Sequence, residues 1–254
     1  MQHIDYNDKK VLDSLGTGHS DGVFQLESAG MKNFMKELKP QSLEDVIAGI
    51  SLYRPGPMDF IPQYIRGKNR PDTIKYDCPQ LEPILKPTYG CIVYQEQVMQ
   101  IVRNLAGYTL GRSDLVRRAM SKKKAAVMEK ERQNFVYGNE AEGVPGCIAN
   151  GISEEIANKI YDDMTEFAKY AFNIMKFEDV SREVLLRTPA NKIYDDMIDF
   201  AKYAFNKSHA AAYAVVSYQT AFLKYYYPVE FMAALMTSVI EMPIKVAEYI
   251  QVCR

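Results

Sequence analysis

The chain has 254 residues, of which 47% are hydrophobic and 25% are charged, and its formal net charge is −1. These values are ordinary for a globular protein, and the length permits one large domain or two small ones. No stretch approaches the roughly 18 uninterrupted apolar residues of a membrane helix, and the N-terminus lacks the apolar segment of a signal peptide. Four cysteines without a CxxC pair and three dispersed histidines argue against a zinc site. The composition predicts a cytoplasmic protein with reduced thiols.

Charge is unevenly distributed along the sequence. Residues 103–124 contain seven basic residues against one acid, Asp114, whereas residues 153–166 contain five acids against one base, Lys159. For nucleic acid binding the distribution of charge matters more than its sum. We therefore expect one anion-binding face on an otherwise neutral molecule.

The first part of the chain predicts helices. Apolar residues over 31–38 recur at i, i+3, i+4 and i+7, which is one helical face. Pro40 ends this helix, and Ser42 with Asp45 resembles a capping box at the start of the next one. The same apolar spacing over 43–50 supports that second helix.

Residues 53–90 differ in character, because they hold seven of the twelve prolines. Proline lacks the N–H group that a helix interior needs. We expect an irregular, loop-rich excursion here, with one short helix near 61–66. Short extended pieces are expected at 73–76 and 91–94.

Regular helix is predicted again from 98 to 105, followed by a turn near Gly107–Gly111. Ser113 is the predicted N-cap of a helix that carries residues 115–120.

Ser153 is the predicted N-cap of a further helix, since two glutamates follow in a first turn where carboxylates suit the helix dipole. Residues 209–240 are strongly helical in pattern, interrupted once at Pro228, and a short helix begins at Pro243. The sequence thus predicts a mainly α fold with a proline-rich excursion and few short strands.

One segment occurs twice. Residues 158–173, NKIYDDMTEFAKYAFN, recur as residues 191–206, NKIYDDMIDFAKYAFN, with only two differences. Two copies are too few for a solenoid, which needs about three or more repeats. We interpret the pair as a local duplication rather than as a repeat architecture or a functional device.

The basic run GRSDLVRRAMSKKK contains the first candidate site residues, which are Arg117, Arg118, Lys122, Lys123 and Lys124. Arginine binds phosphate through a bidentate fork, and lysine acts as a mobile point charge. Arg54 is a second candidate, because it precedes a stiff Pro-Gly-Pro turn that would preorganise it. A solvated basic surface and an exposed arginine on a stable turn are the alternative interpretations.

Two further clusters complete the candidates. Tyr94, Gln95 and Gln97 place an aromatic ring and two amides at a predicted helix start, where bases stack and phosphates bind. Lys207, Ser208 and His209 precede an alanine-rich helix whose first turn could hold phosphate. A helix start with polar caps and a buried histidine with a satisfied partner are the alternatives.

Several common chemistries have no support in the sequence. It contains no GxxxxGK[ST], GxGxxG, HExxH or EF-hand pattern. The pairs Asp162-Asp163 and Asp195-Asp196 are adjacent, so on a helix their side chains diverge by about 100° and make poor joint metal ligands. No spacing supports a Ser-His-Asp triad, and no catalytic residue is predicted.

Longer motifs nevertheless resemble one family. DGVFQLES, LYRPGPM, PTYGCIVYQEQVMQI, GYTLGRSDLVRRAMSKKK, FAKYAFNKSHAAAYAVVSYQT and YPVEFMAALMTS occur in this order. They are similar to the successive motifs of the bacterial DNA polymerase III alpha subunits. The match runs from about Asp13 to the C-terminus, interrupted by the duplicated segment. In that family the FAKYAFN motif runs once, directly into KSHAAAY, so only the second copy supplies Lys207–His209. We expect residues 158–190 to include the least ordered part of the chain.

The resemblance implies a helical fingers domain at 21–240, preceded by the end of a palm region at 1–20 and followed by the beginning of another helical region at 241–254. It implies template-directed DNA synthesis in DNA replication, with template-primer DNA, deoxynucleoside triphosphates (dNTPs) and a holoenzyme with its sliding clamp as partners, and no membrane. The magnesium ions would be held by palm aspartates outside this chain, which alone is expected to be inactive.

The same resemblance divides the candidates by role. Tyr94, Gln95 and Gln97 are expected to line the nascent base pair. The residues expected to contact phosphates of dNTP or DNA are Arg54, Arg117, Arg118, Lys122, Lys123, Lys124, Lys207, Ser208 and His209. A stand-alone nucleic-acid-binding module and a partner-binding helical protein with an incidental basic face are the competing interpretations.

Overall fold

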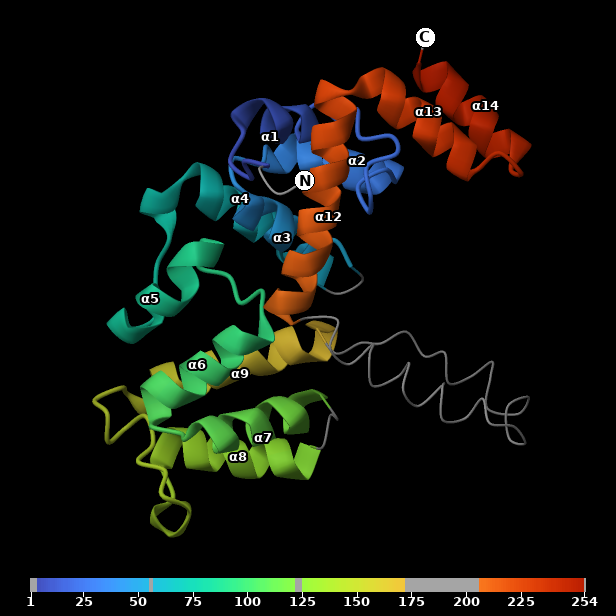
Figure 1. Ribbon diagram of the computed structural model, residues 1–254. Coiled ribbons are helices and arrows are strands. Elements are labelled where there is room, and N and C mark those ends of the chain that lie inside the picture. The colour runs from blue at the N-terminus through green and yellow to red at the C-terminus, as the bar shows by residue number, and fades with distance from the viewer. Residues whose placement is uncertain (1–3, 55–56, 122–124, 172–205, 254) are drawn as a thin grey trace, which may run out of the picture. The chain divides into compact units, whose positions relative to one another are not determined.

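The computed structural model describes residues 4–54, 57–121, 125–171 and 206–253 (Figure 1). Over these residues the fold is mainly α-helical and has no β-strand; Asn139 and Val144 form an isolated bridge. The predicted mainly α fold is confirmed, but the extended pieces expected at 73–76 and 91–94 do not pair into strands.

The chain divides into two compact units. Unit 1 combines Met1–Tyr53 with Ala210–Arg254, and unit 2 is Arg54–His209. The predicted domain boundaries after residues 20 and 240 remain predictions. None of the helices in the described part of the chain is long and apolar enough to cross a membrane.

Unit 1 is built from helices of both chain ends: α1 (Lys9–Leu15), α2 (Ala29–Leu38), α3 (Leu43–Leu52), most of α12 (Lys207–Tyr226), α13 (Pro228–Ser238) and α14 (Pro243–Val252). Ser42 caps α3 by accepting a hydrogen bond from Asp45 N at 3.3 Å, as predicted. The interruption at Pro228 is also confirmed, because α13 starts there.

Polar contacts fasten α12 to the N-terminal segment within unit 1. The hydroxyl of Tyr218, a fully buried side chain, donates a hydrogen bond to Asp5 O at 2.8 Å. Lys224 Nζ donates to His19 O at 2.8 Å and to Asp21 O at 2.7 Å. These bonds join residues about 200 positions apart, so they fix helix α12 on the turns before and after α1.

The proline-rich excursion opens unit 2 as a series of short turns: η1 (Pro57–Phe60), α4 (Ile61–Asn69), η2 (Pro71–Thr73), η3 (Pro79–Leu81), α5 (Glu82–Leu85) and η4 (Lys86–Thr88). Most of these elements place a proline in their first turn. Proline lacks an N–H group, but N–H groups at this position have no acceptor within the helix, so no hydrogen bond is lost. The predicted irregular excursion and its short helix are confirmed.

The rest of unit 2 is a group of packed helices: α6 (Gln95–Ala106), α7 (Leu110–Ser121), α8 (Ala125–Tyr137) and α9 (Glu154–Ala171), with η5 (Glu140–Glu142) between the last two (Figure 1). Their shared core includes fully buried Ile101, Leu105, Phe135 and Met164. Apolar spacing in α6 and α9 thus places these helices against one core.

Two predicted helix starts have different outcomes. Ser153 caps α9 as predicted, with its hydroxyl accepting from Ile156 N at 3.4 Å. The predicted cap Ser113 is wrong, because α7 begins at Leu110 and Ser113 Oγ donates to Leu110 O at 2.7 Å. Thr109 Oγ1 accepts from Arg112 N at 3.3 Å and so takes the capping role. Of the segment 158–190 expected to be least ordered, residues 172–190 lie outside the described part, as does most of the second repeat copy.

Candidate anion-binding site

The first turn of α6 collects the predicted residues Tyr94, Gln95 and Gln97. Tyr94 is the N-cap of the helix and is buried. Gln97 Oε1 accepts hydrogen bonds from the backbone N–H groups of Val93 at 2.8 Å and Tyr94 at 2.9 Å. Because a helix start leaves such N–H groups without helical partners, this contact fixes the direction in which the chain enters α6.

The other end of the Gln97 amide supports the preceding loop. Its Nε2 donates to Ile84 O at 3.1 Å and to Thr88 Oγ1 at 2.7 Å, and Thr88 Oγ1 in turn donates to Cys91 O at 2.6 Å. Gln97 is buried, and both ends of its amide bond to groups within the protein. In this structure it positions the site, and its predicted contact with a base pair remains a prediction.

Arg117 approaches the same turn from α7. Its Nη1 donates to Gln95 Oε1 at 3.1 Å, and its Nε donates to Asp114 Oδ1 at 2.8 Å. Arg118, which is exposed, pairs with the other oxygen of Asp114 at 2.7 Å. Burial would raise the pKa of Asp114, but hydrogen bonds and attraction from the two arginines hold that pKa below its ordinary value. One carboxylate therefore orients both predicted arginines.

Lys207 reaches the α6 start from the first turn of α12. Its backbone N–H donates to both carboxylate oxygens of Glu96, at 3.0 and 3.2 Å, and its Nζ lies 5.3 Å from the centre of the Tyr94 ring. That cation–π geometry holds the ammonium beside the helix start. Ser208 N donates to Asn206 Oδ1 at 2.7 Å, so the first two N–H groups of α12 both meet side-chain oxygens.

Arg54 and His209 form a second electrostatic contact within unit 2. Burial lowers the pKa of His209, and the positive charge of Arg54 lowers it further. Since the ordinary pKa of histidine is about 6.5, this lowered pKa leaves His209 mostly neutral at pH 7. One ring nitrogen of the neutral form donates a hydrogen bond and the other accepts one, so the ring adds little positive charge.

The structure thus brings part of the predicted set together. Arg117 and Lys207 contact consecutive residues of one helix start, Gln95 for the first and Tyr94 and Glu96 for the second. Sequence reasoning missed Asp114 and Glu96 as members of the site, although acids beside basic residues and in a helix first turn were visible signals.

The three consecutive lysines of the basic run are not placed with this site. Lys122, Lys123 and Lys124 lie outside the described residues, which end at 121 in α7 and resume at 125 in α8. Their expected contacts with phosphate therefore remain predictions.

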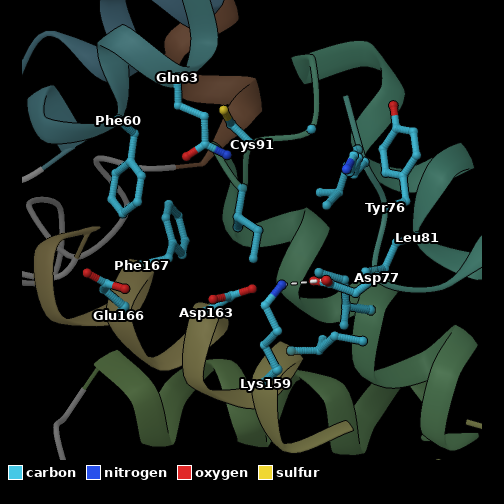
Figure 2. A pocket seen from close by; sticks show the side chains of 16 residues that line it. Phe60, Gln63, Tyr76, Asp77, Leu81, Cys91, Lys159, Asp163, Glu166 and Phe167 are labelled. Atoms are coloured by element: carbon cyan, nitrogen blue, oxygen red, sulfur yellow. Dashed lines mark hydrogen bonds and ion pairs between the residues drawn. The ribbon is translucent and has the colours of Figure 1, made fainter. Parts of the chain in front are cut away.

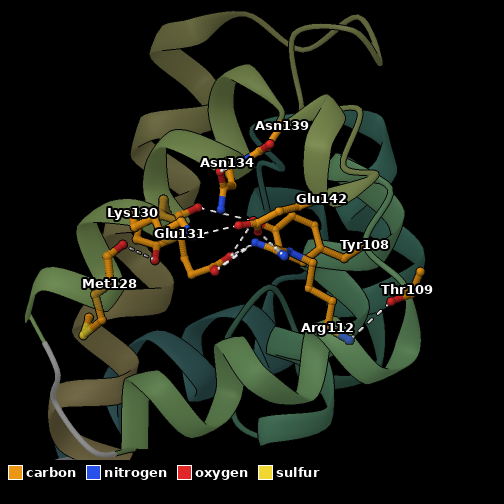
Figure 3. Close-up of polar contacts among 10 residues, drawn as sticks. Tyr108, Thr109, Arg112, Met128, Lys130, Glu131, Asn134, Asn139 and Glu142 are labelled. Carbon is orange, nitrogen blue, oxygen red and sulfur yellow. Dashed lines mark hydrogen bonds and ion pairs between the residues drawn. The ribbon is translucent and has the colours of Figure 1, made fainter.

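Within the basic stretch 103–124, Arg112 is held by acids from other segments, and the expectation of one anion-binding face remains a prediction. Arg112 Nη2 lies 2.9 Å from Glu131 Oε1, and its Nη1 pairs with Glu142 (Figure 3). Tyr108 donates to Glu131 Oε2 at 3.0 Å and presents its ring to the guanidinium at 5.2 Å. Burial would lower the pKa of Arg112, but the two carboxylates raise it. Acids from other segments therefore neutralise this arginine.

A separate cavity of about 300 Å³ lies in unit 2 between the proline-rich excursion and α9. Apolar and charged side chains both line it: Lys159 pairs there with Asp77, and Asp163 points toward the same space (Figure 2). Among the described residues, none of the predicted site residues lines it. In the described residues, no group of three or more histidine, cysteine or acidic side chains comes together to hold a metal ion.

A family model described as "Bacterial DNA polymerase III alpha subunit finger domain" matches residues 1–143 of this chain. The match includes the α6 start and α7 but ends before α12.

Curated relatives extend the similarity to nearly the whole chain. DNA polymerase III subunit alpha of Thermus aquaticus is 44% identical over 253 residues, which is 98% of this chain and 17% of the relative. The proteins of the same name from Halalkalibacterium halodurans and Bacillus subtilis are 41% and 39% identical, over 99% and 98% of this chain and 19% of each relative. The chain therefore spans less than a fifth of the length of these relatives.

Proposed function

The chain belongs to the bacterial DNA polymerase III alpha subunit finger domain family, and from that premise we propose that it is the part of a replicative DNA polymerase that holds the triphosphate of the incoming dNTP. Template-primer DNA passes beside the same surface in this proposal. The full polymerase adds deoxynucleotides to a primer with release of pyrophosphate.

The observation that carries the proposal is the convergence at the α6 start. Arg117 from α7 and Lys207 from α12 are far apart in sequence, yet they contact Gln95 and Tyr94, which are neighbours. A triphosphate has several anionic oxygens, so it can be bound by an arginine fork, a lysine and helix N–H groups at the same time. The buried Tyr94 and Gln95 supply a fixed base for both cations.

Magnesium belongs to the expected chemistry of such a polymerase, where it activates the primer hydroxyl and neutralises charge on the leaving group. The described residues offer no group of three suitable ligands. In this proposal the ions are held by carboxylates of the full-length subunit outside this chain, and the chain alone does not extend a primer. The sliding clamp and the other holoenzyme partners likewise bind the full subunit.

Binding of a dNTP to the 254-residue chain tests the proposal directly. We expect Arg117→Ala to weaken binding about tenfold or more, since it removes a charge-assisted fork, and Arg118→Ala to weaken it less because that side chain is more exposed. Arg103→Ala is the matched control: it removes the same charge from an exposed position on α6 and should change the affinity less than twofold.

Isothermal titration calorimetry at low salt measures these affinities. Equal losses in Arg117→Ala and Arg103→Ala would indicate general electrostatic attraction rather than a site. Salt-dependent DNA binding without any dNTP binding would instead favour a stand-alone nucleic-acid-binding module.

A further inference from the structure

Glu96 occupies an unusual position, because two helices begin beside its carboxylate. It lies in the first turn of α6, and both of its oxygens accept the backbone N–H of Lys207, the first residue of α12, at 3.0 and 3.2 Å. The α6 helix has 12 residues and α12 has 20. Each therefore presents a positive dipole end whose first N–H groups have no partner within the helix itself, which favours an anion.

The surroundings of this carboxylate are those of an anion-binding site. The Lys207 ammonium lies over the ring of Tyr94, two residues before Glu96, and Arg117 donates to Gln95, the residue directly before Glu96. Glu96 is partly buried, so its charge interacts with these neighbours more strongly than a fully hydrated carboxylate would. The side chain thus fills the place in which an external anion would meet the first turn of α12.

We propose that Glu96 is an internal competitor of the triphosphate: it holds the first turn of α12 when no nucleotide is bound, and it must release Lys207 N–H when the triphosphate enters. This inference rests on the proposed function, and it adds how that site is regulated. The glutamate lowers the affinity for triphosphate, and it refills the site when an anionic product leaves.

The physical reason is charge. A triphosphate carries more negative charge and more acceptor oxygens than one carboxylate, so it can engage Lys207 and Arg117 together with the helix N–H. Glu96 and a phosphate cannot share that N–H without repulsion between like charges at a few ångströms. Binding therefore requires Glu96 to turn away, and the free energy of that step reduces the measured affinity.

Glu96→Gln tests this directly, because glutamine has the same length and keeps an acceptor oxygen for Lys207 N–H but loses the charge. We expect the variant to bind inorganic tripolyphosphate roughly tenfold more tightly than the unaltered chain, as removal of one nearby like charge predicts. Glu155→Gln is the matched control. It removes the same charge from an exposed first-turn position of α9 and should leave the affinity within twofold.

Isothermal titration calorimetry with tripolyphosphate, after circular dichroism has established that both variants are folded, gives a decisive result. Tighter binding in Glu96→Gln alone supports the inference. Equal or weaker binding overturns it, because Glu96 then only positions Lys207. If the unaltered chain binds and Arg117→Ala does not, while Glu96→Gln changes nothing, the proposed function stands and this inference alone fails. If no variant binds tripolyphosphate, both fail.

A second measurement does not depend on any substitution. In a nitrogen–proton NMR titration of the unaltered chain, tripolyphosphate should shift the backbone amide of Lys207, since that N–H changes its acceptor. Saturation without a shift at Lys207 would overturn the inference even if the variant failed to fold.

Discussion

Two polar regions of unit 2 use similar residues in opposite ways. In the Arg112 cluster, formed by Tyr108, Arg112, Glu131 and Glu142, the arginine meets carboxylates from two other segments. At the α6 start, Arg117 shares the single carboxylate of Asp114 with Arg118 and also donates to the neutral amide of Gln95. The carboxylate of Glu96 there accepts from a backbone N–H.

The comparison distinguishes a charged side chain that stabilises the fold, Arg112, from one that can exchange its partners for a ligand, Arg117. A guanidinium between two carboxylates is already neutralised, so an external anion has little to gain there. An arginine held partly by an amide, beside a helix start, keeps attraction for phosphate. Arg112 and Arg117 lie five positions apart on α7, so the neighbouring segments, rather than the basic stretch itself, decide which arginine suits a ligand.

The largest expected effect comes from a substitution that removes the arginine of the Arg112 cluster. Arg112→Ala leaves Glu131, whose side chain is 12% exposed, without its cationic partner and with only the Tyr108 hydroxyl as a donor among the described residues. We expect the free energy of unfolding to fall by about 2–3 kcal/mol, less than for a fully buried pair. Arg118→Ala removes a side chain that is 63% exposed and should cost no more than about 0.5 kcal/mol. Urea unfolding measures both, and similar losses would contradict the assigned structural role.

A second expected effect concerns the support of the α6 start. Gln97→Ala removes an amide that makes four hydrogen bonds to the preceding loop and Tyr94, and it leaves buried backbone groups unsatisfied. We expect a loss of about 2 kcal/mol in the free energy of unfolding. Gln100→Ala, an exposed position on the same helix, should change it by less than about 0.5 kcal/mol. If both cost the same, Gln97 does not support the loop.

Local sequence signals predicted much of the fold. Apolar spacing identified α2, α3 and α6, the Ser153 cap identified α9, and proline content identified the excursion, because all three signals act over a few residues. The start of α7 was missed since two hydroxyl residues, Thr109 and Ser113, lie one turn apart and either can cap. Which of the two residues caps α7 depends on how the helix packs, and a local sequence pattern does not contain that information.

The candidate site was predictable by residue type but not by partner. Motif resemblance selected Arg117 and Lys207, yet no spacing rule shows that Lys207 would meet Glu96, 111 positions away. Equally, charge counting grouped Arg112 with Arg117 because it ignores acids from α8 and η5. Long-range packing decides both outcomes.

The smallest expected effect concerns two neighbouring acids of α9, one with an ion-pair partner and one beside a cavity. Asp162 pairs with Arg132, whereas Asp163 faces the cavity of Figure 2. Burial raises the pKa of Asp163 above its ordinary value of 3.8, although Lys159 opposes the shift. The folded chain therefore binds more protons than the unfolded chain just above pH 3.8, so this group stabilises the fold less as the pH rises through that window.

At pH 7 the destabilisation by ionised Asp163 is complete, and Asp163→Asn should raise the free energy of unfolding by a few tenths of a kcal/mol, a small gain because solvent screens an exposed carboxylate. Asp162→Asn should lower it by a similar amount, since it breaks an exposed ion pair. Urea unfolding at pH 7 and again below pH 3.8 measures both, and the Asp163→Asn gain should vanish at the lower pH, where the carboxyl is protonated in either state. Effects of the same sign at pH 7 would show that the two side chains do not differ in their surroundings, because a partner and a cavity act on a carboxylate in opposite directions.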